Sequence, residues 1–203
     1  MTQTRLTRAE QQARTRARLL AAAEELLVRQ GYGATSLDLV AETAGYSKGA
    51  IYSNFASKEA LFLALLQGYM HRLQADLEAL IASPEPGPDR VGLTDWLQAL
   101  PVDENCLRLT TELQLQARRN PAFAADFYAL QQNHFAAVTT HIRRLAGPAV
   151  DRMPIPPETL ARVVLALAHG LGLQAPVNSD AAPASDTGAL IAAVLNLALP
   201  QGI

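Results

Sequence analysis

The stretch from Thr35 to Lys58 constrains the fold of this chain more than any other segment. Apolar side chains recur there at spacings of three and four residues, the stripe of a short amphipathic helix: Leu37, Val40, Ala41 and Ala44. Thr35 is expected to cap this helix through its hydroxyl, with Asp38 three residues later completing a capping-box-like pair. Gly45 then marks a tight turn, a position that often requires a positive φ.

A second short helix is expected after this turn. Ser47 is placed to cap it, and Ala50 and Ile51 turn inward. The residues left on or near its outer side are Lys48, Gly49, Tyr52 and Ser53. Two short helices joined by a tight turn form a helix-turn-helix, whose second helix enters the major groove of DNA. The segment therefore predicts a DNA-binding motif.

A longer helix is expected to precede the motif. Thr7 and Glu10 have the spacing of a capping box, so this helix should begin near Arg8, and Gly31 is placed to end it. Its inner face is apolar: Leu19, Leu20, Ala23, Leu26 and Leu27. Three arginines near its start fit a solvated helix face as well as they fit contacts to phosphate: Arg14, Arg16 and Arg18.

The rest of the chain consists of predicted helices separated by proline and glycine. A helix from Lys58 to Ile81 leads away from the motif, and a proline-rich loop follows it. Further helices are expected over residues 90–100, 103–119, 121–146, 156–175 and 187–199. No alternating β pattern of useful length is present. The predicted fold is therefore all-α, with a three-helix helix-turn-helix head (residues 1–60) on a helical body (residues 61–203).

Charge is distributed unevenly between head and body. The head carries eight Lys/Arg against six Asp/Glu, whereas the body carries nine against 13. A basic head on an acidic body suits a protein that touches phosphate at one end. The single cysteine, Cys106, cannot form an intramolecular disulfide, and the sequence shows neither a membrane span nor an apolar signal core. The cytoplasm is therefore the expected location.

These residues resemble the TetR (tetracycline-repressor-type) family of bacterial transcriptional regulators. The likeness covers roughly residues 16–62, and the body is only loosely similar. It rests on a dense run of short matches: Leu19-Leu20, Ala22-Ala23, Leu26-Leu27, Gly31-Tyr32, Thr35-Ser36, Val40-Ala41, Ala44-Gly45, Ser47-Lys48-Gly49, Ile51-Tyr52, Asn54-Phe55 and Ser57-Lys58-Glu59. Tyr46 departs from the family pattern, which often has valine there, and Gly49 is a weak helix former within the second helix.

The resemblance implies that seven residues bind DNA. They are Thr35, Ser36, Ser47, Lys48, Gly49, Tyr52 and Lys58. The first two resemble phosphate anchors at the start of the first motif helix, and the next three resemble groove-facing residues of the recognition helix. Tyr52 resembles a contact to phosphate or to a thymine methyl group, and Lys58 resembles a phosphate clamp.

The resemblance also implies that the body binds a small molecule. Candidate contacts are Trp96, Cys106, Gln114, Phe127, Tyr128, His134 and His169. Each of them is, in the alternative interpretation, an ordinary core or surface residue. His134 and His141 lie seven residues apart, about 10.5 Å along one helix, which is too far for both to hold one metal ion. Neither a metal nor a cofactor is expected.

A homodimer is expected through the last two helices, about residues 157–199. Both are apolar nearly all round, and a symmetric partner is the usual cover for such a terminal helix. Small side chains would permit close approach of the helices: Ala166, Ala168, Gly170 and Gly172. Burial inside the monomer is the alternative.

Together these features predict a sequence-specific transcriptional regulator. The leading hypothesis is a homodimeric repressor that a small-molecule effector releases from a double-stranded DNA operator, with the helix from Lys58 to Ile81 as the lever. Two alternatives remain open. One is a small helical enzyme that uses Cys106 with a histidine, and the other is a ligand-independent DNA-binding protein with a filled core.

Overall fold

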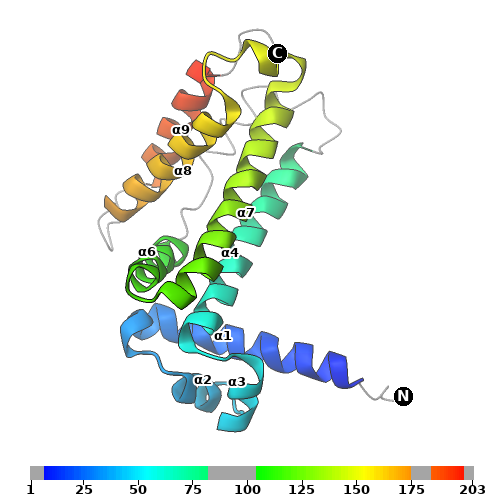
Figure 1. Ribbon diagram of the computed structural model, residues 1–203, viewed down its shortest axis with the longest axis vertical. Coiled ribbons are helices and arrows are strands. Elements are labelled where there is room, and N and C mark those ends of the chain that lie inside the picture. Colours follow the sequence, from blue (N-terminus) through cyan, green and yellow to red (C-terminus); the bar gives the residue numbers. More distant parts are fainter. Residues whose placement is uncertain (1–6, 82–103, 175–183, 199–203) are drawn as a thin grey trace. The chain divides into compact units, whose positions relative to one another are not determined.

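The computed structural model describes residues 7–81, 104–174 and 184–198 (Figure 1). Within these ranges every regular element is a helix and no β-strand is present, so the predicted all-α class is confirmed. No helix in this part of the chain is both long and apolar enough to cross a membrane. The helix predicted over residues 90–100 lies outside the described residues.

The first helix, α1 (Arg8–Ala34), begins with the predicted capping box. Thr7 Oγ1 accepts a hydrogen bond from the Glu10 amide at 3.2 Å, and the Glu10 carboxylate accepts one from the Thr7 amide at 2.7 Å. Both bonds satisfy N–H groups near the helix start that have no partner within the helix. Gly31 has φ 79°, so the regular helix ends there as predicted, and a last turn continues to Ala34.

Helices α2 (Leu37–Thr43) and α3 (Lys48–Asn54) form the predicted helix-turn-helix. Gly45 lies between them with φ 72°, in the left-handed region that favours glycine. Ser47 caps α3, because its hydroxyl oxygen accepts a hydrogen bond from the Ala50 amide at 3.3 Å. The turn and the cap are both confirmed.

The cap of α2 differs from the prediction. Ser36, and not Thr35, accepts a hydrogen bond from the Leu39 amide, at 3.2 Å. The Thr35 hydroxyl instead donates to the Gly31 carbonyl at 2.9 Å, closing the end of α1. Thr35 therefore belongs to the end of the preceding helix and Ser36 to the start of the next.

Six elements follow the motif in the described ranges: α4 (Lys58–Ile81), α6 (Glu104–Arg119), α7 (Pro121–Ala146), the 3-10 helix η1 (Gly147–Arg152), α8 (Pro157–Gln174) and α9 (Ala184–Ala198). Their bounds agree closely with the predicted spans. Two differences stand out: α9 begins at Ala184 rather than at residue 187, and η1 occupies a segment predicted to be a loop.

The chain divides into two compact units. The first comprises the residues up to Tyr69 together with Leu109–Phe127, and the second comprises Met70–Arg108 together with Tyr128 onwards. The boundaries between the units fall within α4, α6 and α7. They differ from the predicted functional division after residue 60, which stays a prediction.

The core of the first unit draws apolar side chains from each helix of the head and from α4. Its fully buried members include Leu19, Leu26, Val40, Ile51, Leu61, Phe62 and Leu66. The rings of Tyr32 and Phe62 meet edge to face, with centroids 5.0 Å apart. Fully burying a side chain such as Ile51 stabilises the fold by about 1.5–3 kcal/mol. Ile51 thereby fixes which face of α3 stays exposed.

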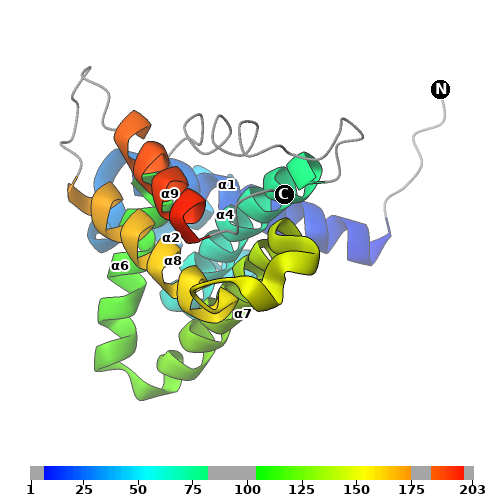
Figure 2. The same ribbon diagram turned by 90° about the horizontal axis from the view of Figure 1, so that it is seen from above.

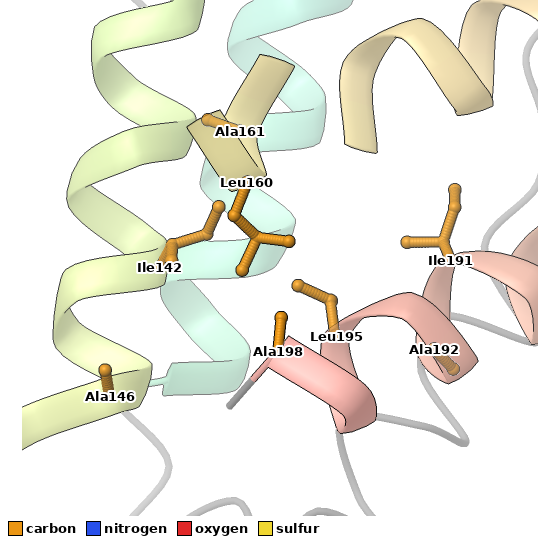
Figure 3. Close-up of a cluster of buried hydrophobic side chains, with 8 residues drawn as sticks. All are labelled: Ile142, Ala146, Leu160, Ala161, Ile191, Ala192, Leu195 and Ala198. Atoms are coloured by element: carbon orange, nitrogen blue, oxygen red, sulfur yellow. The ribbon is translucent and has the colours of Figure 1, made fainter. Parts of the chain in front are cut away.

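The second unit contains the α8–α9 pair, which lie side by side in Figures 1 and 2. A cluster of buried side chains joins this pair to α7: Ile142, Ala146, Leu160, Ala161, Ile191, Ala192, Leu195 and Ala198. Figure 3 shows Leu160 of α8 directed toward Leu195 and Ala198 of α9. The alanines in this cluster leave room for the helices to pack closely.

Candidate nucleic-acid interface and cavity

Helix α3 exposes a polar face near its N-terminal end. Lys48 and Gly49 are exposed in its first turn, and the Tyr52 side chain is 55% exposed one turn later. Ile51, on the opposite side, is completely buried. A Cβ at position 49 would meet only Ser47 Oγ, at 3.8 Å, so open space surrounds the Gly49 backbone. Side chains and backbone on this face are therefore accessible to a duplex.

Asp38 of α2 is bonded to two exposed side chains of α3, Lys48 and Tyr52. Its carboxylate accepts a hydrogen bond from Lys48 Nζ at 2.6 Å and a longer one from the Tyr52 hydroxyl at 3.4 Å. The hydrogen bond to Asp38 raises the pKa of Lys48 above its ordinary value. The prediction that Asp38 completes a capping pair is wrong, because Ser36 caps α2 and the Asp38 carboxylate bonds to Lys48 and Tyr52 of α3.

The two predicted phosphate anchors of α2 differ in accessibility. The Thr35 side chain is only 2% exposed, and its hydroxyl is bonded to the Gly31 carbonyl. This burial does not favour a side-chain contact from Thr35 to phosphate, and the predicted role of Thr35 stays a prediction. Ser36 is exposed at the start of α2, and its contact with phosphate stays a prediction.

Lys58, at the start of α4, is bonded within the head. Its Nζ donates to the Gly33 carbonyl at 3.2 Å and lies 4.3 Å from the centroid of the Tyr32 ring. Burial lowers the pKa of Lys58, while the charges of Glu59 and Glu112 oppose that shift. These contacts tie α4 to the end of α1. They do not test the predicted role of Lys58 as a phosphate clamp, which stays a prediction.

Arg16 connects α1 to the end of α3. Its Nη1 donates to the Asn54 carbonyl at 3.0 Å, and its guanidinium carbon lies 4.3 Å from the centroid of the Phe55 ring. Of the three arginines near the start of α1, this one therefore supports the motif from within the head. Arg14 and Arg18 are exposed.

A cavity of about 150 Å³ lies within the second unit, bounded by α4, α7, α8 and α9. Most of its lining is apolar: Leu73, Leu77, Val138, Ile142, Leu145, Val164, Leu165, Ala168, Ile191 and Leu195. Three polar side chains complete the lining: Gln74, His134 and His141. An engineered protein cavity of about this volume holds a benzene molecule. The space therefore suits a small organic ligand.

The polar side of the cavity consists of a bonded pair and one imidazole. Gln74 Nε2 lies 3.3 Å from His134 Nδ1, within hydrogen-bond distance. His141 is 3% exposed, and its Nδ1 has no hydrogen-bond partner among the described residues. Burial lowers the pKa of both histidines; for His141, Glu78 opposes the shift and Arg144 adds to it.

Of the seven predicted ligand contacts, His134 lines this cavity. Phe127 does not, because it is buried in the first unit, with its ring centroid 6.2 Å from that of Phe123. It is a core residue, as befits a large aromatic side chain. Four others lie outside the lining: Cys106, Gln114, Tyr128 and His169. Trp96 lies outside the described residues.

Apart from His134, no residue of the described lining is in the sequence-based set of ligand contacts, and two of the missing residues, Gln74 and His141, are polar. For His141 a signal exists, since residues seven apart on an α-helix lie on nearly the same face and His134 was already in the set. For Gln74 no signal exists. Its part in the cavity depends on how α4 packs against α7.

Two family models match the chain. The model described as bacterial regulatory proteins, tetR family, matches residues 19–65, which include α2 and α3. The model described as BetI-type transcriptional repressor, C-terminal, matches residues 90–200, more than half of the chain. Together they cover both the helix-turn-helix and the helices that line the cavity after α4.

Individual relatives and a solved structure agree with these models. The chain is 45% identical over 58 residues to the HTH-type transcriptional activator FasR of Mycolicibacterium smegmatis, a match spanning 29% of this chain and 26% of FasR. It is 28% identical over 162 residues to the HTH-type transcriptional regulator EthR of the same species, a match spanning 75% of this chain and 73% of EthR. The reduced form of E. coli NemR has the same fold, with a TM-score of 0.66 at 23% identity over 93% of this chain and 100% of NemR.

Proposed function

Because this chain belongs to the TetR family of bacterial transcriptional regulators, we propose that it is a dimeric repressor that a small molecule releases from operator DNA. The observation that carries the proposal is the helix-turn-helix within the matched segment, whose second helix exposes Lys48, Gly49 and Tyr52. Regulators of this family bind operator DNA and small-molecule effectors, act as dimers and are normally not enzymes.

In the proposed complex, α3 lies in the major groove of the operator. The proposed contact residues are Ser36, Ser47, Lys48, Gly49 and Tyr52, with Lys58 at the start of α4. Gly49 lets the backbone approach the duplex, and Tyr52 contacts phosphate or a thymine methyl group. Lys48 exchanges its bond to Asp38 for one to a phosphate or a base edge.

The proposed dimer interface is the outer face of α8 and α9. Four large apolar side chains on these helices are exposed: Val163, Leu173, Leu190 and Leu197. Leu197 is 83% exposed. Exposed apolar side chains on two neighbouring helices support an interaction surface there, and a two-fold axis would cover each copy with the same residues of the other. The dimer would then read two half-sites about 34–36 Å apart, or modestly farther.

Repression is proposed from the match of residues 90–200 to the C-terminal part of BetI-type repressors. The activator FasR matches only 29% of this chain. The longer match covers helices α6 to α9, and with them most of the cavity lining. The part of the chain that we assign to regulation therefore favours a repressor.

The cavity of the second unit is the proposed effector site. Helix α4 lines it with Leu73, Gln74 and Leu77 and also contributes Phe62 and Leu66 to the core of the first unit. A ligand that shifts α4 therefore acts on a helix that both units share. It releases the operator to the extent that it binds the released state more tightly than the DNA-bound state.

An electrophoretic mobility-shift titration with DNA from the region upstream of the gene tests the proposal. We expect retardation that is selective over a scrambled duplex of equal composition and that weakens steeply with salt. Tyr52→Ala should weaken binding by about tenfold. The matched change Val28→Ala, at an exposed position of α1, should leave it unchanged. Equal retardation of both duplexes would contradict operator binding.

A further inference from the structure

About three turns at the start of α1 extend beyond the rest of the head. Residues 7–18, which we call the overhang, are all exposed except Thr15, which is partly buried. The first buried side chain of α1 is Leu19, and at 1.5 Å per residue Arg8 lies about 16.5 Å from it along the helix axis. Figures 1 and 2 both show this start of α1, in blue, extending away from α2 and α3. The overhang therefore has a surface that the head does not cover.

The overhang is strongly basic. It carries four arginines and one acidic residue, Glu10. The Glu10 carboxylate accepts hydrogen bonds from the amide and the hydroxyl of Thr7, at 2.7 and 2.8 Å, and these bonds lower its pKa below the ordinary value. Glu10 is thus occupied by the cap of α1. A run of exposed arginines is complementary in charge to the phosphates of a nucleic acid.

One stripe of the overhang continues the face by which α1 packs into the head. That face is buried from Leu19 onward. Residues three or four apart lie on the same side of a helix, so the stripe runs back from Leu19 through three polar side chains: Arg16, Gln12 and Arg8. Arg14 points to the other side, because two residues turn a helix by about 200°. The overhang therefore has two distinguishable sides, each with arginine.

Arg16 anchors the overhang beside the recognition helix. Its Nη1 donates to the carbonyl of Asn54, the last residue of α3, at 3.0 Å. Helix α3 is about 10.5 Å long, and the major groove of B-DNA is about 12 Å wide between its two phosphate strands. With α3 in the groove, a segment that extends from beside its last residue lies next to the phosphates that border the groove.

We propose that the overhang binds the DNA phosphates that flank each half-site, through Arg8 and Gln12. The arginine forms a charge-assisted hydrogen bond to phosphate, and the glutamine amide donates a second bond. Such contacts add affinity and fix the position of the protein on the duplex, but they do not read the base sequence. The inference rests on the proposed function, because it requires α3 to lie in the groove of an operator.

Fluorescence anisotropy with two operator duplexes tests this contact. The shorter duplex contains only the two half-sites, delimited by the base substitutions that weaken binding. The longer one adds about six base pairs of scrambled sequence on each side, since about 16.5 Å of helix spans about five base pairs. We expect the wild-type protein to bind the longer duplex more tightly, by about two- to fivefold for each half-site, with a steeper salt dependence. Equal affinity for the two duplexes would overturn the proposal.

Arg8→Gln and Arg14→Gln compare the two sides of the overhang. Both remove one charge from an exposed position of α1, and glutamine is a good helix former, so we expect unchanged Tm values. Arg8→Gln should abolish most of the preference for the longer duplex and lower the salt slope on it by about one for each half-site. Arg14→Gln should keep the preference. An equal loss in both variants would indicate a general effect of charge, and no loss in Arg8→Gln would leave the overhang to another partner; either result overturns the proposal.

The same measurements separate this inference from the proposed function. Selective binding of the shorter duplex by the wild-type protein tests recognition by α3 alone. If both duplexes bound selectively and with equal affinity, the flanking contact would be wrong and operator recognition would stand. If neither duplex bound more tightly than a fully scrambled one, the proposed function would fail and this inference with it.

Discussion

Lys48 Nζ lies 2.6 Å from Asp38 Oδ2, so the first residue of the recognition helix is ion-paired within the protein. Both side chains are substantially exposed, at 73% and 43%. The pair therefore sits on the surface that is proposed to meet DNA. A phosphate that approaches Lys48 competes with the Asp38 carboxylate and is repelled by it.

Asp38→Asn should strengthen operator binding, because it frees Lys48 and removes one negative charge from the surface. We expect affinity to rise about two- to fivefold, as for an exposed ion pair, and the salt dependence to steepen by about one phosphate contact. Fluorescence anisotropy at two or more salt concentrations measures both. Glu42→Gln removes the same charge from an exposed position of α2 whose side chain has no described bond to Lys48, and should have a smaller effect. Equal or weaker binding by Asp38→Asn would show that Asp38 does not oppose DNA.

Gly45→Ala should destabilise the head, because Gly45 has φ 72° and a side chain is strained there. A residue held in a sparsely populated conformation costs on the order of 1–3 kcal/mol, or about 3–10 °C in Tm for a chain of this length. Gly33→Ala is the matched control, because Gly33 has no positive φ and a Cβ there meets open space. Thermal unfolding followed by circular dichroism compares the two. Equal Tm values would contradict the strain at Gly45.

Leu197→Glu should convert the proposed dimer to a monomer. Leu197 is 83% exposed on α9, so a glutamate there is tolerated in the monomer, but it introduces a charge into the apolar surface of the proposed interface. Size-exclusion chromatography with light scattering gives the mass. Leu115→Glu, at a 44% exposed position of α6, should leave the mass unchanged. A dimeric Leu197→Glu protein would place the interface elsewhere.

His134→Leu should flatten the pH dependence of stability. Burial lowers the pKa of His134 in the folded protein below the ordinary value of 6.5. Below about pH 6.5 the unfolded chain therefore binds a proton that the folded protein does not, and the free energy of unfolding falls as the pH falls. The fall continues down to the folded pKa and is absent above about pH 7. Tm values between pH 5 and 8 should drop less for His134→Leu than for the wild-type protein.

The matched control for this change is His71→Leu, at an exposed position of α4. It should keep the wild-type pH profile, because it leaves His134 in place. If Tm fell equally with pH in the wild-type protein, His134→Leu and His71→Leu, His134 would not be buried in solution.

The features that the sequence predicts correctly depend on residues close together in the chain. The capping box of Thr7 and Glu10 and the cap at Ser47 each span three residues, and the turn needs only Gly45 itself. Helix periodicity is similarly local. These signals suffice for the all-α class, for most helix bounds and for the helix-turn-helix.

The features that the sequence misses depend on how helices pack. Asp38 was expected to cap its own helix, but the approach of α3 offers its carboxylate a charged partner ten residues away. Thr35 does not cap α2 as predicted, because its hydroxyl donates to the Gly31 carbonyl at the end of α1. Phe127 could equally have faced a ligand or a core, and only the packing beside Phe123 decides. Spacing along one helix contains none of this information.

The ion pair of Lys48 with Asp38 also bears on how the regulator searches a genome. Non-specific adhesion to DNA depends on free cations facing phosphate, and the lysine of α3 is the only cationic residue in that helix. With its charge satisfied by Asp38, the protein should dwell more briefly at each of the many wrong sites. Only the operator sequence would supply a better partner than the Asp38 carboxylate. Lys48 would therefore leave Asp38 there and bond to the DNA. Asp38 would then shorten the search for the operator as well as lower the affinity for DNA.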